Sequence, residues 1–127
     1  MWMLLQGNLG LAELLSGDTD AARHAFREEL RLCRELVDRH YISEGLRGLA
    51  AVAAVHGDLR RAAQLVGASS AHRYGQSFEV IEARLDASFF AAARVRCGNE
   101  AWAAAARQGG ALTFDEAISY ALEEPHA

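Results

Sequence analysis

The chain has 127 residues, of which 51% are hydrophobic, so its length suits a single domain with a substantial core. Its net charge of −4 argues against a general nucleic-acid binder, because such proteins usually carry a basic stripe. All 13 of its Lys and Arg residues are arginines, and they alternate with acidic residues, so we expect no basic face and no direct nucleic-acid binding. β-Branched residues are few and scattered, which leaves no strand-like run and indicates an all-α fold.

The cysteines and the N-terminal stretch indicate where the protein resides. Cys33 and Cys97 belong to no CxxC pair and have no histidine at metal-ligand spacing, so we interpret them as free thiols, with a disulfide as the alternative. The first ten residues, MWMLLQGNLG, lack the basic segment and the cleavage site of a signal peptide. No apolar run is long enough to span a membrane. We therefore expect a cytoplasmic protein without a membrane partner.

The first third of the chain predicts a helical hairpin. Its first helix covers Trp2–Ser16, and its second runs from Asp18 to about Arg39. Gly17 ends the first helix and Asp18 caps the second. The second helix carries an apolar stripe with a period of about 3.6 residues. The stripe contains Ala22, Ala25, Phe26, Leu30, Cys33, Leu36 and Val37.

The same pattern repeats 40 residues later, where LAAVAAVHGDLRRAAQLV (Leu49–Val66) aligns with LGLAELLSGDTDAARHAF (Leu9–Phe26) and the two Gly-Asp turns coincide. The second hairpin then has helices over about Ser43–His56 and Asp58–Arg73. Its first helix is apolar nearly all round and should be the buried centre of the fold. Two copies of one helical hairpin predict a stacked solenoid.

Three further helices complete the predicted fold, over about Phe78–Arg96, Glu100–Gln108 and Thr113–Leu122. Gly109-Gly110 should end the second of these, and the capping box T-x-x-E opens the third. The sequence thus predicts an all-α fold in which antiparallel helical hairpins stack as a short tetratricopeptide-like solenoid of about seven helices. We assign residues 1–123 to one helical-repeat domain and residues 124–127 to a C-terminal tail.

Two segments resemble a known family. GLAAVAAVHGDLRRAAQLVGASSAHR (Gly48–Arg73) and WAAAARQGGALTFDEAISYAL (Trp102–Leu122) resemble the tetratricopeptide-like (MalT-like) C-terminal helical region of actinobacterial LuxR-type and related ATPase transcriptional regulators. The likeness covers about residues 9–122. After Gly75 the chain reads Gln-Ser where that family usually has prolines, and it lacks a P-loop, a cyclase domain and a helix-turn-helix reader. The resemblance therefore implies the scaffold part of such a regulator, and neither ATPase nor DNA-binding activity.

No set of residues predicts catalysis or metal binding. His24, His40, His56 and His72 recur every 16 residues, but that spacing does not align them on one helix face, and no HxxxH or CxxC pair supports a zinc site. Ser69-Ser70 lies in no nucleophile elbow. We therefore predict a protein that is not an enzyme and needs no cofactor or metal.

The apolar N-terminus favours a protein-interaction module. Trp2, Met3, Leu4 and Leu5 would be exposed in a lone monomer, and large exposed apolar patches mark interfaces. We predict homodimerisation through this face, with the first helix covering that of its mate or exchanging with it.

A small-molecule sensor is the alternative function. The resemblance implies that an inducer can bind inside such a solenoid. The channel between the second hairpin and the fifth helix is the predicted groove. Its candidate lining residues are Tyr41, Arg73, Tyr74 and Arg84.

Overall fold

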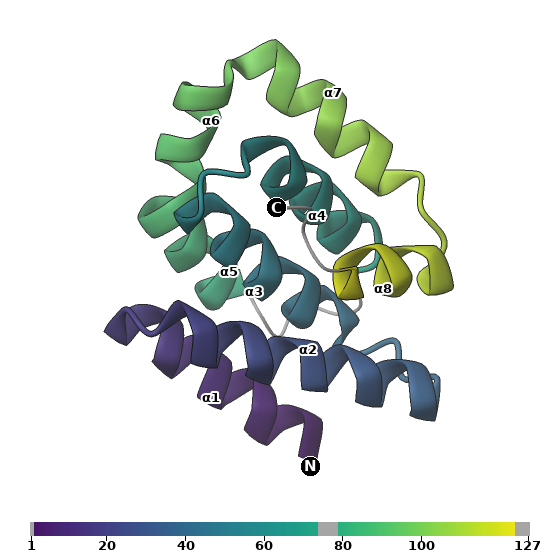
Figure 1. Ribbon diagram of the computed structural model, residues 1–127. Coiled ribbons are helices and arrows are strands. Elements are labelled where there is room, and N and C mark those ends of the chain that lie inside the picture. Colours follow the sequence, from purple (N-terminus) through teal and green to yellow (C-terminus); the bar gives the residue numbers. More distant parts are fainter. Residues whose placement is uncertain (1, 74–78, 124–127) are drawn as a thin grey trace.

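The computed structural model describes residues 2–73 and 79–123, apart from the side chains of residues 2–4 and 79. Within these ranges every regular element is helical, as predicted (Figure 1). The elements are α1 (Trp2–Ser16), α2 (Thr19–Leu36), α3 (Ile42–Val55), α4 (Leu59–Ala71), α5 (Glu79–Leu85), the π-helical segment η1 (Asp86–Phe90), α6 (Ala91–Cys97), α7 (Asn99–Gly110) and α8 (Phe114–Leu122). Because α5, η1 and α6 follow one another without a break, these elements form about seven rods, as the sequence predicts.

The two predicted hairpins are confirmed, and their turns share one geometry. Gly17 has φ +94° and Gly57 has φ +81°, a left-handed conformation that glycine adopts without steric cost. The aspartate that follows each glycine caps the next helix. The Asp18 carboxylate accepts from the Ala21 N–H at 3.1 Å, and Asp58 does the same for Arg61 at 3.3 Å. The 40-residue repeat read from the sequence is therefore a structural repeat.

The end of α2 differs from the prediction. The helix stops at Leu36 rather than near Arg39, and Val37 adopts the left-handed conformation with φ +51°. The Asp38 N–H bonds back to the Cys33 carbonyl at 2.8 Å, which closes the last turn. Leu36 is the last residue of α2 and Val37 lies beyond it. Neither side chain continues the buried stripe, and they are 62% and 66% exposed.

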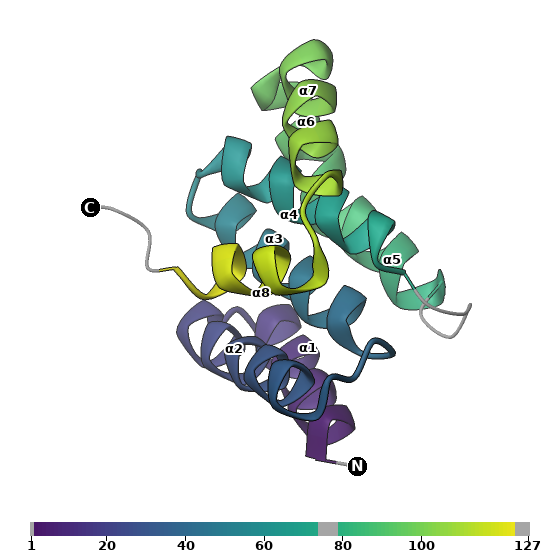
Figure 2. The ribbon, with the colours of Figure 1, turned by 90° about the vertical axis from the view of Figure 1, so that its right-hand side faces the viewer.

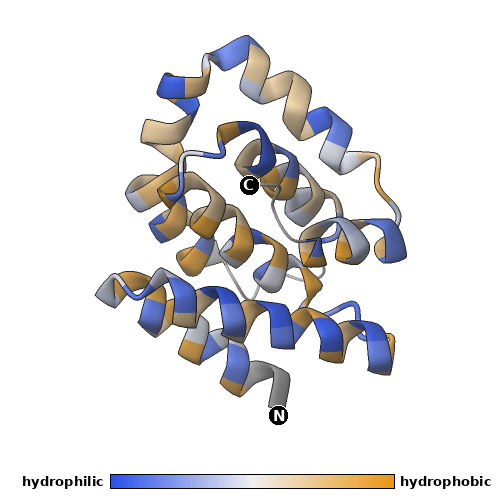
Figure 3. Cartoon of the chain, viewed as in Figure 1, coloured by the Kyte–Doolittle hydropathy of each residue, from blue (hydrophilic) through white to orange (hydrophobic). Residues whose placement is uncertain are grey.

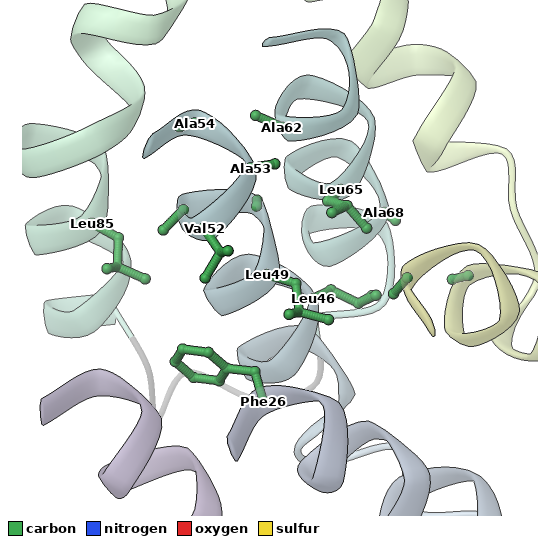
Figure 4. Packing of buried hydrophobic residues seen from close by; sticks show 14 of the residues in the cluster. Phe26, Leu46, Leu49, Val52, Ala53, Ala54, Ala62, Leu65, Ala68 and Leu85 are labelled. Carbon is green, nitrogen blue, oxygen red and sulfur yellow. The ribbon is translucent and has the colours of Figure 1, made fainter. Parts of the chain in front are cut away.

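Glycines let α1, α2 and α3 approach one another closely. The Phe26 ring of α2 packs against Gly10 of α1 and Gly48 of α3, and a Cβ atom at either glycine would overlap the ring. Every residue from Ile42 to Ala54 of α3 is buried, as predicted for the central helix. Figure 4 shows Phe26 below α3 and Leu85 of α5 to the left of the same helix.

The pairing of α7 departs from a regular stack. Instead of closing a third hairpin with α6, α7 packs chiefly on α4 and runs across the top of the molecule in Figure 1. Gly67 of α4 faces the Ala106 carbonyl, and Gly109 of α7 faces the Gln64 carbonyl, so the two backbones are in contact. The helix ends at Gly110, at the predicted Gly109-Gly110 pair, but both glycines are helical, so α7 runs two residues beyond the predicted Gln108, and Gly109 also packs on α4.

The last helix, α8, returns to the hairpins and contacts α2, α3 and α4 (Figure 2). Its predicted capping box is confirmed, since Thr113 and Glu116 each accept from the backbone N–H of the other. At its other end the Arg61 guanidinium donates to the carbonyls of Tyr120, Ala121 and Glu123 at 3.0–3.1 Å. One hydrophobic core then extends from Leu14 to Ala121.

The predicted boundary of the C-terminal tail, residues 124–127, lies outside the described residues. None of the described helices has both the length and the apolar character that a membrane crossing requires.

The contact between α4 and α7 predicts opposite effects for two neighbouring glycines. Gly109→Ala should lower the free energy of unfolding by about 1–3 kcal/mol, because its Cβ would collide with the Gln64 carbonyl. Gly110→Ala is the matched control, since its Cβ would meet nothing nearer than 3.6 Å, and it should be neutral or slightly stabilising. Urea denaturation followed by circular dichroism measures both. Equal effects of the two substitutions would contradict the close approach.

Candidate functional site

The predicted groove residues that the structure describes lie on different elements and line none of the pockets described below. Tyr41 stands at the N-terminus of α3, with its ring 5.0 Å from that of His40. Arg73 follows α4 and pairs with Glu82 of α5, with 3.0 Å between Nε and Oε1. Arg84 is exposed on α5. Tyr74 lies outside the described residues.

A buried arginine that sequence analysis missed, Arg47, lies between the second hairpin and α5. Arg47 of α3 donates from Nε to the Ser69 hydroxyl at 3.1 Å and from Nη2 to the Ser70 hydroxyl at 2.9 Å. Its Nη2 also lies 3.4 Å from the Glu82 carboxylate. Burial lowers the pKa of Arg47, and the Glu82 carboxylate opposes that shift. The network ties α5 to the second hairpin. The only sign of Arg47 in the sequence was one basic residue in the middle of a largely apolar helix.

The predicted interface lies on a helix that is packed on one side. Trp2, Met3 and Leu4 belong to α1, but their side chains lie outside the described residues. Leu5 and Leu9, one turn apart, are 54% and 49% exposed. Glu13 is the only charged residue of α1. The helix packs on α2 and, less extensively, on α3. Its exposed side chains are mostly apolar, with Asn8 and Ser16 among them, and no other described element covers them extensively.

A pocket of about 220 Å³ opens at the seam of α2, α3, α4 and α8. Its apolar wall consists of Leu49, Val52, Ala53 and Ala121, and its polar wall consists of Arg23, Arg27, His56, Asp58, Arg61 and Glu123. Basic groups outnumber the two carboxylates. Sequence reasoning missed this site because its walls come from four helices that are distant along the chain.

The positive side of the pocket continues along α2. Arg23, Arg27 and Arg31 are spaced four residues apart and so follow one face of the helix. A shallow groove runs beside them, lined also by Asp20 and His24. Figure 3 shows hydrophilic and hydrophobic positions alternating along this helix. Acidic side chains accompany these arginines, because Asp20 lines the same groove and Arg31 is paired with Glu28 at 2.8 Å.

Two carboxyl groups are buried under α1. Glu29 of α2 is fully buried and Glu44 of α3 is nearly so. Both side chains converge on Gly7 of α1, where a Cβ atom would collide with them. Burial, together with the hydrogen bond and the charge of Glu44, raises the pKa of Glu29 from 4.5 to about 12. Glu29 is therefore protonated at neutral pH, and Glu44 is the carboxyl group beside it.

The histidines and cysteines of the described ranges form no site together. His24 lines the α2 groove, whereas Nε2 of His72 lies 2.7 Å from the Leu112 carbonyl at the end of α7. Among the described residues, no three His, Cys, Asp or Glu side chains are grouped so that they could hold a metal ion. Cys33 and Cys97 are free thiols, as predicted, and burial raises the pKa of Cys33.

Compared with known proteins, the chain matches no family model, no curated protein and no solved structure. The resemblance of Gly48–Arg73 and Trp102–Leu122 to LuxR-type regulators therefore stays a prediction. Function has to be inferred from the surfaces of the described residues.

The buried acid pair predicts a specific pH dependence of stability. Because the pKa of Glu29 is higher in the folded than in the unfolded state, its contribution is complete below about pH 4.5 and is lost as the pH rises toward about 12. The limiting slope is about 1.4 kcal/mol per pH unit. The variant Glu29→Gln should remove this slope, so its advantage over the native protein should grow between about pH 5 and about pH 8.

Urea unfolding at several pH values measures that difference. Glu35→Gln, at an exposed position of the same helix, is the control and should run parallel to the native protein. A gap between Glu29→Gln and the native protein that stays constant with pH would refute the raised pKa.

Proposed function

We propose that this protein is a non-catalytic helical-repeat interaction module that self-associates through the outer face of α1. The observation that carries the proposal is a comparison within the repeat. Leu9 of α1 and Leu49 of α3 occupy equivalent positions, yet Leu9 is 49% exposed and Leu49 only 5%.

The difference follows from neighbours rather than from composition. α3 lies between α2 on one side and α4 on the other, so each of its faces is covered. α1 packs on α2, its partner in the first hairpin, and less extensively on α3. α2 covers one face of α3, whereas no described helix covers the corresponding face of α1. A second copy, related by a twofold axis, would supply that neighbour with the same apolar surface.

The proposed context is a transcriptional regulator in the cytoplasm. It is supported by the similarity of the two quoted segments to the C-terminal helical region of LuxR-type regulators, and by their capped hairpins. In that context the module would transmit a signal by changing its association state. Direct nucleic-acid binding is not part of the proposal, because the net charge is −4.

Small-molecule sensing is the second candidate function. The observation that favours it is the pocket between α2, α3, α4 and α8, which combines an apolar wall with several polar groups. This pocket is not the predicted channel at Tyr41, Arg73 and Arg84, where the Arg47 network supplies polar contacts between the helices.

The self-association proposal predicts the effect of changing the α1 face. The native protein should have twice the protomer mass in light scattering at tens of micromolar. The double variant Leu5→Gln/Leu9→Gln should be monomeric with an unchanged helical circular dichroism spectrum, because both side chains are already half-exposed and contribute little to the core.

A matched control is available on another helix. Val95 of α6 is 79% exposed, so Val95→Gln removes a surface apolar group of similar kind and should leave the mass doubled. A native protein that is strictly monomeric, or a double variant that dimerises as well as the native protein, would overturn the proposal.

A further inference from the structure

We propose that two copies of this protein pair through antiparallel α1 helices, so that the large exposed side chains of each α1 pack against the small ones of the other. Leu5 would lie beside Ser16 of the second copy, and Leu9 beside its Ala12. This inference deepens the proposed self-association and rests on it. It adds the direction and the register of the pairing.

Buried and exposed positions lie on opposite sides of α1. Gly7 and Gly10 face side chains of α2 and α3, and Leu14 is buried. With about 3.6 residues per turn, these three positions share one side of the helix. The opposite side carries four exposed residues, spaced by four, three and four positions, which we call the outer row: Leu5, Leu9, Ala12 and Ser16. Such spacing is that of a seam between paired helices.

The outer row is large at one end and small at the other. Leu5 and Leu9 occupy its N-terminal half, and Ala12 and Ser16 its C-terminal half. The spacing is the same in both directions, so an antiparallel second copy presents its row in register with the first. A leucine then meets alanine or serine at every level. A parallel copy would place leucine against leucine at one end and leave a gap at the other, where packing contacts are lost.

The charge of α1 favours the same direction. Glu13 is its only charged residue, and it lies beside the outer row on the same flank as Gln6, seven residues earlier. In a parallel pair the two Glu13 carboxylates would lie at one level and repel each other. In the antiparallel register they are about 7.5 Å apart along the axis, and each approaches Gln6 of the second copy. The helix dipoles are also opposed in an antiparallel pair.

The length of α1 sets the expected strength of the pairing. The helix has 15 residues and is about 22 Å long. A contact between two helices of this length lies at the low end of interface sizes, where complexes are transient. The dimer should therefore dissociate on dilution through the micromolar range.

Disulfide trapping tests the direction. The variants Leu5→Cys and Ser16→Cys are made separately in a Cys97→Ser background, because Cys97 is partly exposed whereas Cys33 is buried. In the proposed register these two positions of opposite copies lie side by side. Two copies of position 5 are then about 16 Å apart along the axis, which is beyond the reach of a disulfide. An affinity tag on one variant gives the mixed dimer a distinct mass on a non-reducing gel.

Under mild oxidation the mixed disulfide should form at least tenfold more than the disulfide of either variant with itself. Val95→Cys mixed with Leu5→Cys is the control for random collision, because Val95 is an exposed residue of α6. Self-trapping of Leu5→Cys would overturn the antiparallel direction and leave self-association intact. A dimer that traps neither disulfide would overturn this inference, and a native protein that is monomeric in light scattering would overturn both.

An exchange of side-chain sizes tests the register without cysteines. Leu9→Ala and Ala12→Leu should each raise the dissociation constant severalfold, because the first leaves a gap and the second sets leucine against leucine. The double variant Leu9→Ala/Ala12→Leu again pairs large with small and should regain the native constant in light scattering on dilution. Both positions are exposed, so the helical circular dichroism spectrum should not change. A double variant that is weaker than either single variant would overturn the register.

Discussion

The Phe26 ring is held between two glycines, Gly10 of α1 and Gly48 of α3, and the arrangement of the first three helices depends on that contact. One turn further along α2, Gly7 of α1 faces the carboxyl groups of Glu29 and Glu44, and Gly45 of α3 faces the side chain of Leu30. Each of these glycines is a position without a side chain on a helix face, so the large residues of α2 can sit almost against the neighbouring backbones. A methyl group at any of these four glycines would force the helices apart or displace a buried side chain.

The same constraint acts again between α4 and α7, with backbone in place of a ring. Gly67 and Gly109 bring each helix against a carbonyl of the other, which aligns α7 along α4 rather than along α6. The stack is therefore regular through two hairpins and then changes its pairing. This change leaves α8 to cover the seam of α2, α3 and α4, and the pocket lies at that seam.

The two candidate surfaces are linked by α2. Phe26 fixes α2 against α1 and α3, and Arg23 and Arg27 flank Phe26 on the same helix. The arginines that line the pocket and the ring that contacts α1 thus belong to one helix. A ligand that moved these arginines would act on α2, the helix on which α1 and its proposed dimer face pack. Glu29 and Glu44 lie under α1, so the docking of α1 involves two buried carboxyl groups, of which Glu29 has a raised pKa, as well as apolar contact.

Local patterns in the sequence determined the helices, the Gly-Asp turns and the capping box, because each depends on residues within one or two turns of one another. The 40-residue repeat likewise followed from spacing alone. Only the tertiary structure decided that Gly109 packs against α4, that Leu36 and Val37 face outward, and that Arg23 and Arg27 line a pocket with Ala121. Those outcomes depend on which helix lies beside which, and the burial of a side chain is set by neighbours far away along the chain.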